Sequence, residues 1–414
     1  MGIDQQGEYD HKKLGRQLDL FYIDETVGAG LPLFTAKGAV VKRELERFIV
    51  DEEIKRGYLH VCTPDIAKLD LYIKSGHYPH YKDSMYAPIE IDDEKFMLRP
   101  MTCPHHFQLY LRKPHSYREL PMRIAELAKL YRYEQTGELM GLQRTRTFCL
   151  ADAHIICASE EQAVCEIGNA LDLIEYVTSV FGLKYGKDYY YRLSLGDTTN
   201  KEKYYKNDEA WRKSEILLRD LLGKRKNSFT EAKNEAAFYG PKIDIQMKNV
   251  NGKEDTAFTV QYDFCMPDRF DLSYIGQDGN KNRAFVVHRS SLGAIERIMA
   301  FLIEHYAGAF PLWLSPVHVM VIPIGKSQQV YAQKIHRFLG EAQIRAELDD
   351  SDETLGKRIR TAKIQKIPYL VVVGEKEIKE KRIAVERRDG KSASLSSEKF
   401  LQKLKKEIAE RTIF

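Results

Sequence analysis

Residues 130–148 have the sequence LYRYEQTGELMGLQRTRTF, which is the most informative stretch of the chain. Its two ends predict extended runs, and the glycines between them predict a connecting loop. Arg132 and Glu134 are two residues apart, so in a strand both side chains would lie on one face. The planar guanidinium of Arg132 suits phosphoryl oxygens, Glu134 can accept a hydrogen bond from an amine, and Phe148 offers an aromatic face. Taken alone, the same residues also fit a solvated hairpin with a surface ion pair.

A helix followed by a short strand precedes this hairpin. Apolar residues recur at three- and four-residue spacing over 40–49, which predicts a helix, and Gly57 suits its left-handed cap. The strand predicted over 59–64 is stopped by its proline. Taken alone, this helix and strand indicate neither a fold family nor a function.

A strand followed by a helix comes after the hairpin. The strand is predicted over 285–288 and the helix over 292–306. Gly293 allows close approach of another backbone segment, and Arg297 falls on the first turns of the helix. An ordinary amphipathic helix would show the same features.

The segments between these landmarks are mixed. Over 85–160 the pattern predicts short extended runs and turns, and over 161–181 it predicts a long helix. Several β-rich runs follow over 188–265. The polar, Lys-rich stretch 199–232 among them is interpreted as a surface insertion.

A change in charge divides the chain. Its 414 residues carry a net charge of only +4, but residues 315–414 hold 21 Lys and Arg against 14 Asp and Glu, a net of +7, and residues 1–314 have a net of −3. The change falls at 310–316, a segment with two prolines. Beyond it, strands and helices alternate, with Ser327 as a predicted N-cap, which indicates a small α/β domain with a mixed sheet.

The composition excludes several classes of protein. With 43% hydrophobic and 30% charged residues the chain is not a disordered protein, and with no run of 18 apolar residues it has no membrane-spanning helix. The N-terminus lacks the apolar core of a signal peptide. Six cysteines without framework spacing indicate a reducing compartment. We expect a cytoplasmic protein, or one in an organelle matrix after processing.

Together, the three landmarks resemble motifs 1, 2 and 3 of the class II aminoacyl-tRNA synthetases, and within that class the chain is similar to the threonyl-tRNA synthetase family. The resemblance covers nearly the whole chain. The residues that carry it are 10–15, 75–77, 81–85, 99–104, 152–155, 238–244, 287–289 and 310–314.

The resemblance implies an architecture. Residues 1–20 would be an N-terminal arm, and residues 21–312 an α+β catalytic domain with an antiparallel sheet flanked by helices. Residues 313–414 would be a small α/β anticodon-binding domain with a mixed sheet. Motif 1 would form a homodimer. The editing region with which many relatives begin is expected to be missing.

The resemblance also implies a reaction and a metal. The expected reaction is the ATP-dependent ligation of L-threonine to tRNA(Thr) through threonyl-adenylate. One zinc ion per chain would be held by Cys103, His154 and His288, and would bind the amine and hydroxyl of threonine. Three protein ligands leave an open position for substrate, as in catalytic zinc sites. Each of the three, taken singly, also fits a packed core residue.

Family positions assign roles to further residues. ATP, with its Mg²⁺, would be bound by Arg132, Glu134, Arg144, Phe148, Gln261 and Arg297. Threonine would be bound by Met101, Asp152, Tyr239, Lys242 and Gln261. Catalysis would depend on Arg132, Arg297, His77 and Lys242, with His77 receiving the proton of the ribose 2′-hydroxyl. Glu377, Arg387 and Arg388 would contact the anticodon, although a solvated charged loop explains them equally well.

Some positions depart from the family. Cys149, Leu150 and Ala151 replace a polar segment, Thr102 and His105 flank Cys103 where Asn and a small residue are usual, and Ala257 and Phe258 replace a smaller pair. Glu386 stands where an Arg is expected. Leu150 and Glu386 leave open a non-catalytic paralogue that binds RNA, and the altered pocket positions leave open a duplicated form that resists an inhibitor. A class II enzyme of another specificity, such as seryl or prolyl, is a further alternative.

Overall fold

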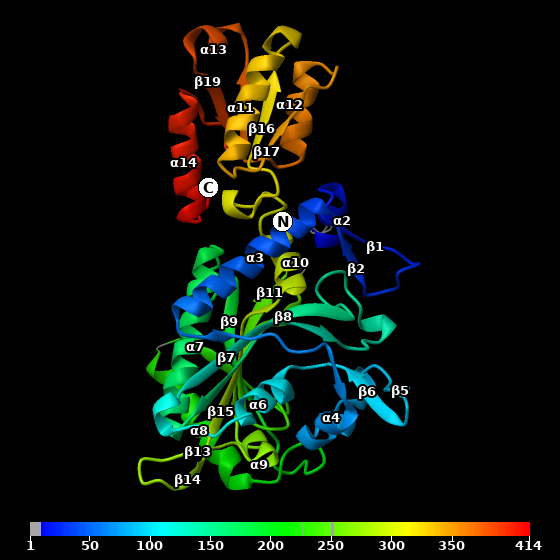
Figure 1. Ribbon diagram of the computed structural model, residues 1–414, viewed down its shortest axis with the longest axis vertical. Helices are drawn as coiled ribbons and strands as arrows, with labels where there is room; N and C mark the ends of the chain where they lie inside the picture. The colour runs from blue at the N-terminus through cyan, green and yellow to red at the C-terminus, as the bar shows by residue number, and fades with distance from the viewer. Residues whose placement is uncertain (1–9, 226, 250–251) are drawn as a thin grey trace. The chain divides into compact units, whose positions relative to one another are not determined.

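The structure is a computed structural model that describes residues 10–225, 227–249 and 252–414. The chain folds into two compact units (Figure 1). The first, called the body here, holds Ile23–Pro32 and Glu46–Ala300. The second, the C-terminal unit, holds Phe301–Phe414, Leu33–Leu45 and the described part of Met1–Tyr22. The domain boundaries predicted after residues 20 and 312 stay predictions, and residues 1–9 of the predicted arm lie outside the described residues.

An eight-stranded sheet forms the centre of the body, in the order β10-β9-β11-β12-β15-β8-β7-β3. Neighbouring strands from β9 to β7 pair antiparallel, and the edge strands β10 and β3 pair parallel to their neighbours. The predicted α+β fold with an antiparallel sheet is confirmed. The strands are β3 Leu59–His60, β7 Met122–Tyr131, β8 Thr147–Cys157, β9 Tyr189–Leu195, β10 Phe229–Lys233, β11 Lys242–Lys248, β12 Glu254–Asp263 and β15 Phe285–Ala294.

Helix α7, Glu160–Val180, covers one face of this sheet and confirms the predicted long helix (Figure 1). Its apolar stripe is buried, and the Ser159 side chain caps its first turn by accepting from the Gln162 backbone N–H. The interpretation of 199–232 as a surface insertion is wrong over helix α8, Asp208–Lys224. That helix buries Trp211 within the body, so its polar composition reflects only its outer face.

Helix α6, Cys103–Leu111, corrects the prediction of only extended runs and turns over 85–160. Most of its side chains are buried, so it lacks a polar face that would mark a helix. The other elements of the first 300 residues are α2 His11–Gln17, β1 Phe21–Ile23, β2 Pro32–Phe34, α3 Ala36–Lys55, β4 Ile66–Lys68, α4 Leu69–Ser75, α5 His77–His80, η1 Lys82–Ser84, β5 Ile89–Ile91, β6 Glu94–Leu98, η2 Tyr117–Glu119, η3 Thr136–Glu138, α9 Met266–Phe270, β13 Ser273–Ile275, β14 Lys281–Arg283 and α10 Ile295–His305.

The turn from β15 to α10 requires a glycine. The pairing of β15 with β8 is interrupted between Ser290 and Ala294, and Gly293 within this bulge has a φ of +67°. A Cβ on Gly293 would lie 2.0 Å from the backbone oxygen of Ala257. The predicted close backbone approach at Gly293 is therefore confirmed, and Arg297 lies on the first turn of α10 as predicted.

The C-terminal unit contains a five-stranded sheet in the order β17-β16-β18-β19-β20. Strand β16 is parallel to β17 and β18, whereas β19 and β20 pair antiparallel, which confirms the predicted mixed sheet. Gln328, not Ser327, is the N-cap of α11, because Ser327 lies within a preceding 3-10 turn. The elements are η4 Leu312–Leu314, β16 Val319–Pro323, η5 Lys326–Gln328, α11 Gln329–Glu341, β17 Ala346–Leu348, α12 Leu355–Ile364, β18 Tyr369–Val373, α13 Glu375–Glu380, β19 Ile383–Arg387, β20 Ser392–Leu395 and α14 Ser397–Ala409.

Among the described residues, no helix has both the length and the apolar character that crossing a membrane requires.

Candidate active site

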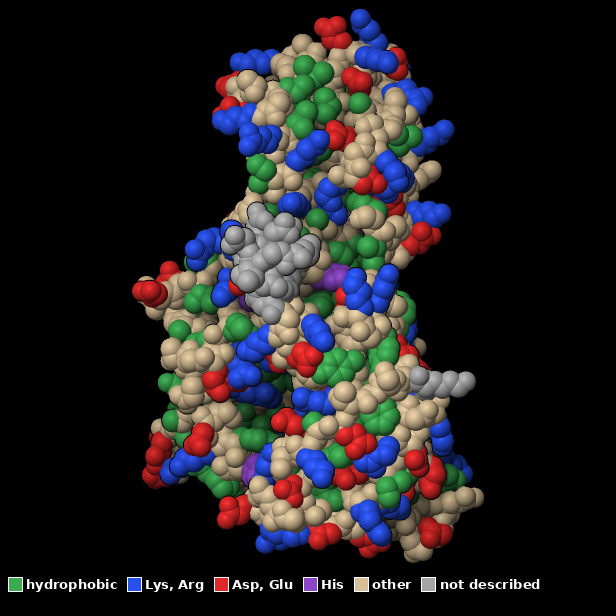
Figure 2. All heavy atoms as spheres, turned by 180° about the vertical axis from the view of Figure 1, so that it is seen from behind, with side chains coloured by type: hydrophobic (Ala, Val, Ile, Leu, Met, Phe, Trp, Pro, Cys, Tyr) green, Lys and Arg blue, Asp and Glu red, His purple; other side chains and the backbone are tan. Residues whose placement is uncertain are grey.

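A cavity of about 630 Å³ opens on the body's sheet. Figure 2 shows the body hollowed on this side, with Lys and Arg side chains around the opening. Every site residue predicted for the catalytic domain lines this one cavity. They are His77, Met101, Cys103, Arg132, Glu134, Arg144, Phe148, Asp152, His154, Tyr239, Lys242, Gln261, His288 and Arg297.

The register of the sheet brings distant residues together. Four of them form one row of cross-strand partners: Lys242 on β11, Gln261 on β12, His288 on β15 and His154 on β8. Asp152 lies two residues before His154 and therefore on the same face of β8. The cavity floor is thus a row of polar side chains on a sheet whose strands are otherwise largely apolar.

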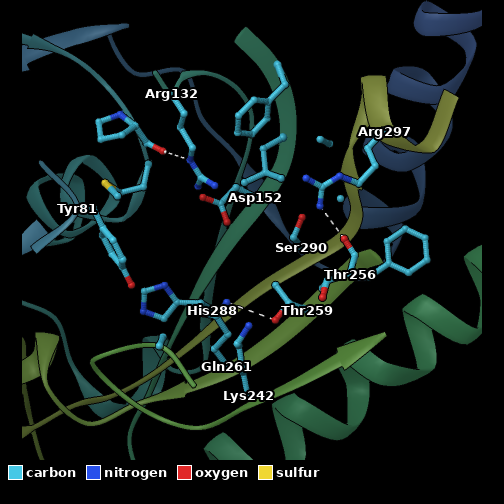
Figure 3. Close-up of a pocket in the computed structure, with 18 of the residues that line it drawn as sticks. Tyr81, Arg132, Asp152, Lys242, Thr256, Thr259, Gln261, His288, Ser290 and Arg297 are labelled. Carbon is cyan, nitrogen blue, oxygen red and sulfur yellow. Dashed lines mark hydrogen bonds between the residues drawn. The ribbon is translucent and has the colours of Figure 1, made fainter. Parts of the chain in front are cut away.

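Two guanidinium groups face each other across the cavity. Figure 3 shows Arg132 and Arg297 pointing inward from opposite sides. Nε of Arg132 donates to the Pro100 backbone oxygen at 3.2 Å. Arg297 donates from Nε to the Gln143 oxygen at 3.0 Å and from Nη1 to the Thr256 oxygen at 2.7 Å. Backbone carbonyls therefore hold both side chains while their positive charges face the cavity.

Arg132 and Glu134 follow the end of β7 at Tyr131 and do not lie within a strand. The prediction that they share one face of a strand is therefore wrong, yet both side chains line the cavity. The guanidinium of Arg132 lies 5.2 Å from the ring centroid of Phe148. Burial, together with the charge of Arg297, lowers the pKa of Arg132. An anion between the two Arg side chains would relieve this repulsion.

The loop between β7 and β8 carries a third cation. Nη1 of Arg144 lies 4.0 Å from a carboxylate oxygen of Glu134 and 3.7 Å from one of Glu138. Its side chain is partly exposed and lines the cavity.

Cys103, His154 and His288 form a buried group. Their candidate ligand atoms all lie within 4.8 Å of one another, and the three residues come from α6, β8 and β15. A thiolate and two imidazoles are the donors that zinc prefers. Among the described residues this is the group of His, Cys, Asp and Glu side chains whose spacing fits a metal ion.

The hydrogen bonding of His288 and the neutral state of His154 agree with a metal site, whereas Cys103 would have to lose its proton to bind a metal. Nε2 of His288 lies 2.6 Å from a carboxylate oxygen of Asp263, so it donates there and leaves Nδ1 as the free ligand atom. Burial raises the pKa of the Cys103 thiol well above its usual value, as do Asp152 and Asp263. Burial lowers the pKa of His154 well below its usual value, which keeps the imidazole neutral and able to bind a metal.

Aromatic and polar side chains form the wall beside this group. The Tyr239 ring stacks on the His288 ring with centroids 4.8 Å apart, and its hydroxyl donates to Gln261. Nζ of Lys242 lies 3.0 Å from an Asp244 carboxylate oxygen. Met101 lines the cavity near the start of α6. The wall combines one cation, one amide and one phenol around a small space.

His77 lies at the start of α5 with a fixed ring orientation. The Ser75 hydroxyl donates to the Tyr72 backbone oxygen at 3.0 Å, so it accepts from Nδ1 of His77 at 2.7 Å. This leaves a lone pair on Nε2, which lies 3.8 Å from the Cys103 sulfur. Burial lowers the pKa of His77 to about 3. The ring is therefore neutral and lines the cavity, and a pKa this low makes it a weak base.

The predicted anticodon residues lie in the C-terminal unit. Glu377 accepts from the Gly374 backbone N–H at 2.9 Å at the start of α13. Arg387 pairs with Asp389 at the end of β19. Arg388 donates to three backbone oxygens, those of Lys366, Ala309 and Phe310. Glu386, the departure from the family, pairs with Lys363 at 2.7 Å. The roles of Glu377, Arg387 and Arg388 in RNA binding stay predictions.

The cavity also contains residues to which the sequence assigned no role. Ser290 and Thr259 face it because each lies two residues from a predicted site residue on its strand. Strand alternation would have indicated both. Arg289 lines the cavity as well, but its Nη1 is 2.6 Å from a buried carboxylate oxygen of Glu53, and no local pattern predicts this pair.

Comparison with known families agrees with this architecture. The family model described as the tRNA synthetase class II core domain (G, H, P, S and T) matches residues 86–306, and the one described as an anticodon binding domain matches residues 318–407. Fold and site thus define a class II aminoacyl-tRNA synthetase core joined to an anticodon-binding domain.

Individual relatives narrow the class. Threonine–tRNA ligase of Geobacillus sp. (strain WCH70) is 48% identical over 408 residues, which cover 98% of this chain and 63% of that protein. The same-named protein of Geobacillus kaustophilus (strain HTA426) is 46% identical over 411 residues, covering 99% and 62%. The chain therefore spans less than two thirds of the length of these curated relatives.

A solved structure agrees over nearly the whole chain. It is described as the RNA binding domain of threonyl-tRNA synthetase from Cryptosporidium parvum Iowa II, and it matches with a TM-score of 0.90 and 32% identity, covering 96% of this chain and 98% of that one. The chain belongs to the threonyl-tRNA synthetase family.

Proposed function

We propose that this chain is a threonine–tRNA ligase, which uses ATP to join L-threonine to tRNA(Thr) through threonyl-adenylate. One observation carries the proposal. A single cavity holds two opposed guanidinium groups, which suit a polyphosphate, beside a buried Cys/His/His group, which suits a metal ion. Membership of the family supports the same reading.

In the first step, the threonine carboxylate attacks the α-phosphorus of ATP, and pyrophosphate leaves with the electrons of the broken bond. Such a transfer needs positioning and charge stabilisation more than covalent help. Arg132 binds the α-phosphate and the carboxylate, whereas Arg144 and Arg297 bind the outer phosphates with the Mg²⁺ that accompanies ATP. Glu134 accepts from the adenine amine, and Phe148 stacks on the adenine ring.

Cys103, His154 and His288 would hold one zinc ion per chain. When bound, the ion would offer a coordination position to the amine and hydroxyl of threonine, so valine, which lacks the hydroxyl, would be rejected. The side chains that would surround the amino acid are Met101, Asp152, Tyr239, Lys242 and Gln261.

In the second step, the terminal ribose hydroxyl of the tRNA attacks the carbonyl carbon of the adenylate, and AMP leaves. Nε2 of His77 accepts the proton of the 2′-hydroxyl. The hydrogen bond from Nδ1 to Ser75 supports this role, because it leaves Nε2 unprotonated. Lys242 stabilises negative charge near the same end of the cavity.

The C-terminal unit would recognise tRNA. A net charge of +7 on residues 315–414 supplies attraction for phosphates, and Figure 2 shows Lys and Arg side chains spread over this unit. Glu377, Arg387 and Arg388 would contact the anticodon. We further propose that two copies pair through motif 1, which includes α3. We also propose that the protein acts in the cytoplasm, in keeping with the lack of a disulfide bond among the described residues.

We also propose that this 414-residue polypeptide does not remove misattached serine. Serine keeps the amine and hydroxyl of threonine and lacks one methyl, which provides roughly 1–3 kcal/mol of discrimination. We expect measurable seryl-tRNA(Thr) that persists in the presence of the protein. Rapid hydrolysis of seryl-tRNA(Thr) by this chain would contradict the proposal.

Threonine-dependent exchange of pyrophosphate into ATP tests the main proposal. We expect exchange with threonine, weak exchange with serine and none above background with valine or proline. A strong zinc chelator should abolish it, and added zinc should restore it. Zinc-loaded protein that shows no exchange with threonine would favour the non-catalytic paralogue, and exchange with proline would favour a different specificity.

A further inference from the structure

His106 is a fully buried histidine that touches the metal-binding group without belonging to it. It lies on α6, three residues after Cys103. Both of its ring nitrogens have partners. Nδ1 lies 2.8 Å from Nδ1 of His154, and Nε2 lies 3.2 Å from a carboxylate oxygen of Glu126.

Glu126 is in turn held by several groups. Its carboxylate accepts from the Thr63 backbone N–H at 3.1 Å, from the Thr63 hydroxyl at 2.7 Å and from Nη1 of Arg99 at 3.1 Å. Burial raises the pKa of Glu126, but the hydrogen bonds from His106 and Thr63 and the charge of Arg99 outweigh it and lower the pKa to about 2. An ionised carboxylate can only accept hydrogen bonds.

Glu126, at one end of this row of hydrogen bonds, fixes the direction of the hydrogen bond from His106. Because Glu126 only accepts, Nε2 of His106 carries the proton. Nδ1 of His154 is occupied by the 2.8 Å contact with Nδ1 of His106, so the ring atom that His154 can offer to a metal ion is Nε2. With its lone pair on Nε2, His154 carries its proton on Nδ1 and donates it to Nδ1 of His106.

We propose that His106 and Glu126 are positioning residues that fix the tautomer and ring orientation of His154, so that its Nε2 is presented to a metal ion. The proposal rests on the metal site of the proposed function. His288 has the same arrangement in a shorter form, because its Nε2 donates directly to Asp263. Outer partners of this kind orient metal-binding imidazoles and raise their basicity.

The row of hydrogen bonds Glu126–His106–His154, called the relay here, also reaches motif 1. Thr63 lies three residues after the end of β3, and its backbone and side chain both bind Glu126. The row Thr63–Glu126–His106–His154 therefore runs from the motif 1 strand to the candidate ligand through hydrogen bonds alone.

The neighbouring His105 offers a matched control. It is buried on the same helix, yet neither of its ring nitrogens has a partner among the described residues. His105→Leu and His106→Leu thus remove the same side chain from adjacent buried positions, and only the second breaks the relay. His106→Asn keeps an acceptor, Oδ1, near the place of Nδ1.

Zinc affinity, measured by competition with a chromophoric chelator on the full chain, is the first readout. We expect His106→Leu to weaken zinc binding by about 10- to 100-fold. His105→Leu should leave it unchanged, and His106→Asn should restore most of it. Equal losses in the two Leu variants, or no loss in His106→Leu, would overturn the proposal. If His106→Leu does not fold, Glu126→Gln should weaken zinc binding in its place, and unchanged affinity there would equally overturn the proposal.

The tautomer of His154 in zinc-free wild-type protein is the second readout, through its ring ¹⁵N chemical shifts. The relay predicts a proton on Nδ1 and none on Nε2. A proton on Nε2 overturns the relay whatever the zinc affinity. Failure of the wild type to bind zinc would refute the metal site itself. This outcome can be distinguished from failure of the relay, because the ring ¹⁵N shifts are measured in zinc-free protein.

Discussion

The charge and position of Arg132 indicate that the cavity binds an anion. Its half-buried guanidinium faces that of Arg297, so an anion between the two would be favoured. We expect Arg132→Lys to lower kcat/KM of pyrophosphate exchange by about 10²-fold or more, because lysine lacks the planar fork that holds two oxygens. The melting temperature should change little. Arg212→Lys, at an exposed position of α8, is the control and should retain full activity.

Gly293 is a residue whose backbone conformation cannot be adopted by another residue without strain. With a φ of +67° and the Ala257 oxygen 2.0 Å from an added Cβ, Gly293→Ala must shift the bulge of β15. We expect the free energy of unfolding to fall by about 2–4 kcal/mol, measured by urea denaturation. Gly223→Ala is the matched control. An added Cβ meets nothing within 4 Å there, and the change in helix α8 should stabilise by about 0.5–1 kcal/mol. Equal effects of both changes would contradict this account.

At the scale of residues, family motifs predicted which side chains line the cavity, but no pattern in the sequence predicted why they meet. Cys103, His154 and His288 are separated by 51 and 134 positions. Their approach depends on the pairing of His154 with His288 across β8 and β15, and register of this kind has no local signal. The contact of His106 with His154 likewise has no local signal in the sequence.

A substitution in helix α8 can test whether 199–232 is a surface insertion, an interpretation that the structure contradicts. Trp211 is almost fully buried, its Nε1 donates to the Tyr205 oxygen at 2.9 Å, and its ring packs edge-on against Phe264. We expect Trp211→Ala to destabilise the body by about 3–5 kcal/mol, as measured by chemical denaturation. A surface insertion would tolerate the change. Lys213→Ala, at an exposed position of the same helix, should alter stability by less than about 0.5 kcal/mol.

At the scale of elements, prediction succeeded where one face of an element was polar. Helix α7 has an apolar stripe and a Ser cap, so it was located closely. Helix α6 was missed because it is enclosed on most sides, which removes the periodic polar residues on which the prediction depends. Strand β20 is short and mostly exposed, and its Ser-rich sequence fits a loop as well.

At the scale of the whole molecule, the charge pattern predicts a change of domain, which stays a prediction, but not how the chain is divided in space. The boundary at 310–316 agrees with the gap between the two family matches, 86–306 and 318–407. The C-terminal unit also includes Leu33–Leu45, to which Arg345 contributes a 3.0 Å ion pair with Glu44. A contact between positions 301 residues apart leaves no trace in composition.

The proposed division of function between the two units leads to a prediction that separates RNA binding from adenylate formation. Lys376 and Lys379 are exposed on α13 beside Glu377, the residue expected at the anticodon. If both contact phosphates, replacing them with Gln should make the plot of log affinity for tRNA(Thr) against log salt shallower by about 2. Threonine-dependent pyrophosphate exchange requires no tRNA, so the same double variant should retain the full rate. An unchanged salt slope would place the tRNA elsewhere, and a reduced exchange rate would show that α13 affects the body's chemistry.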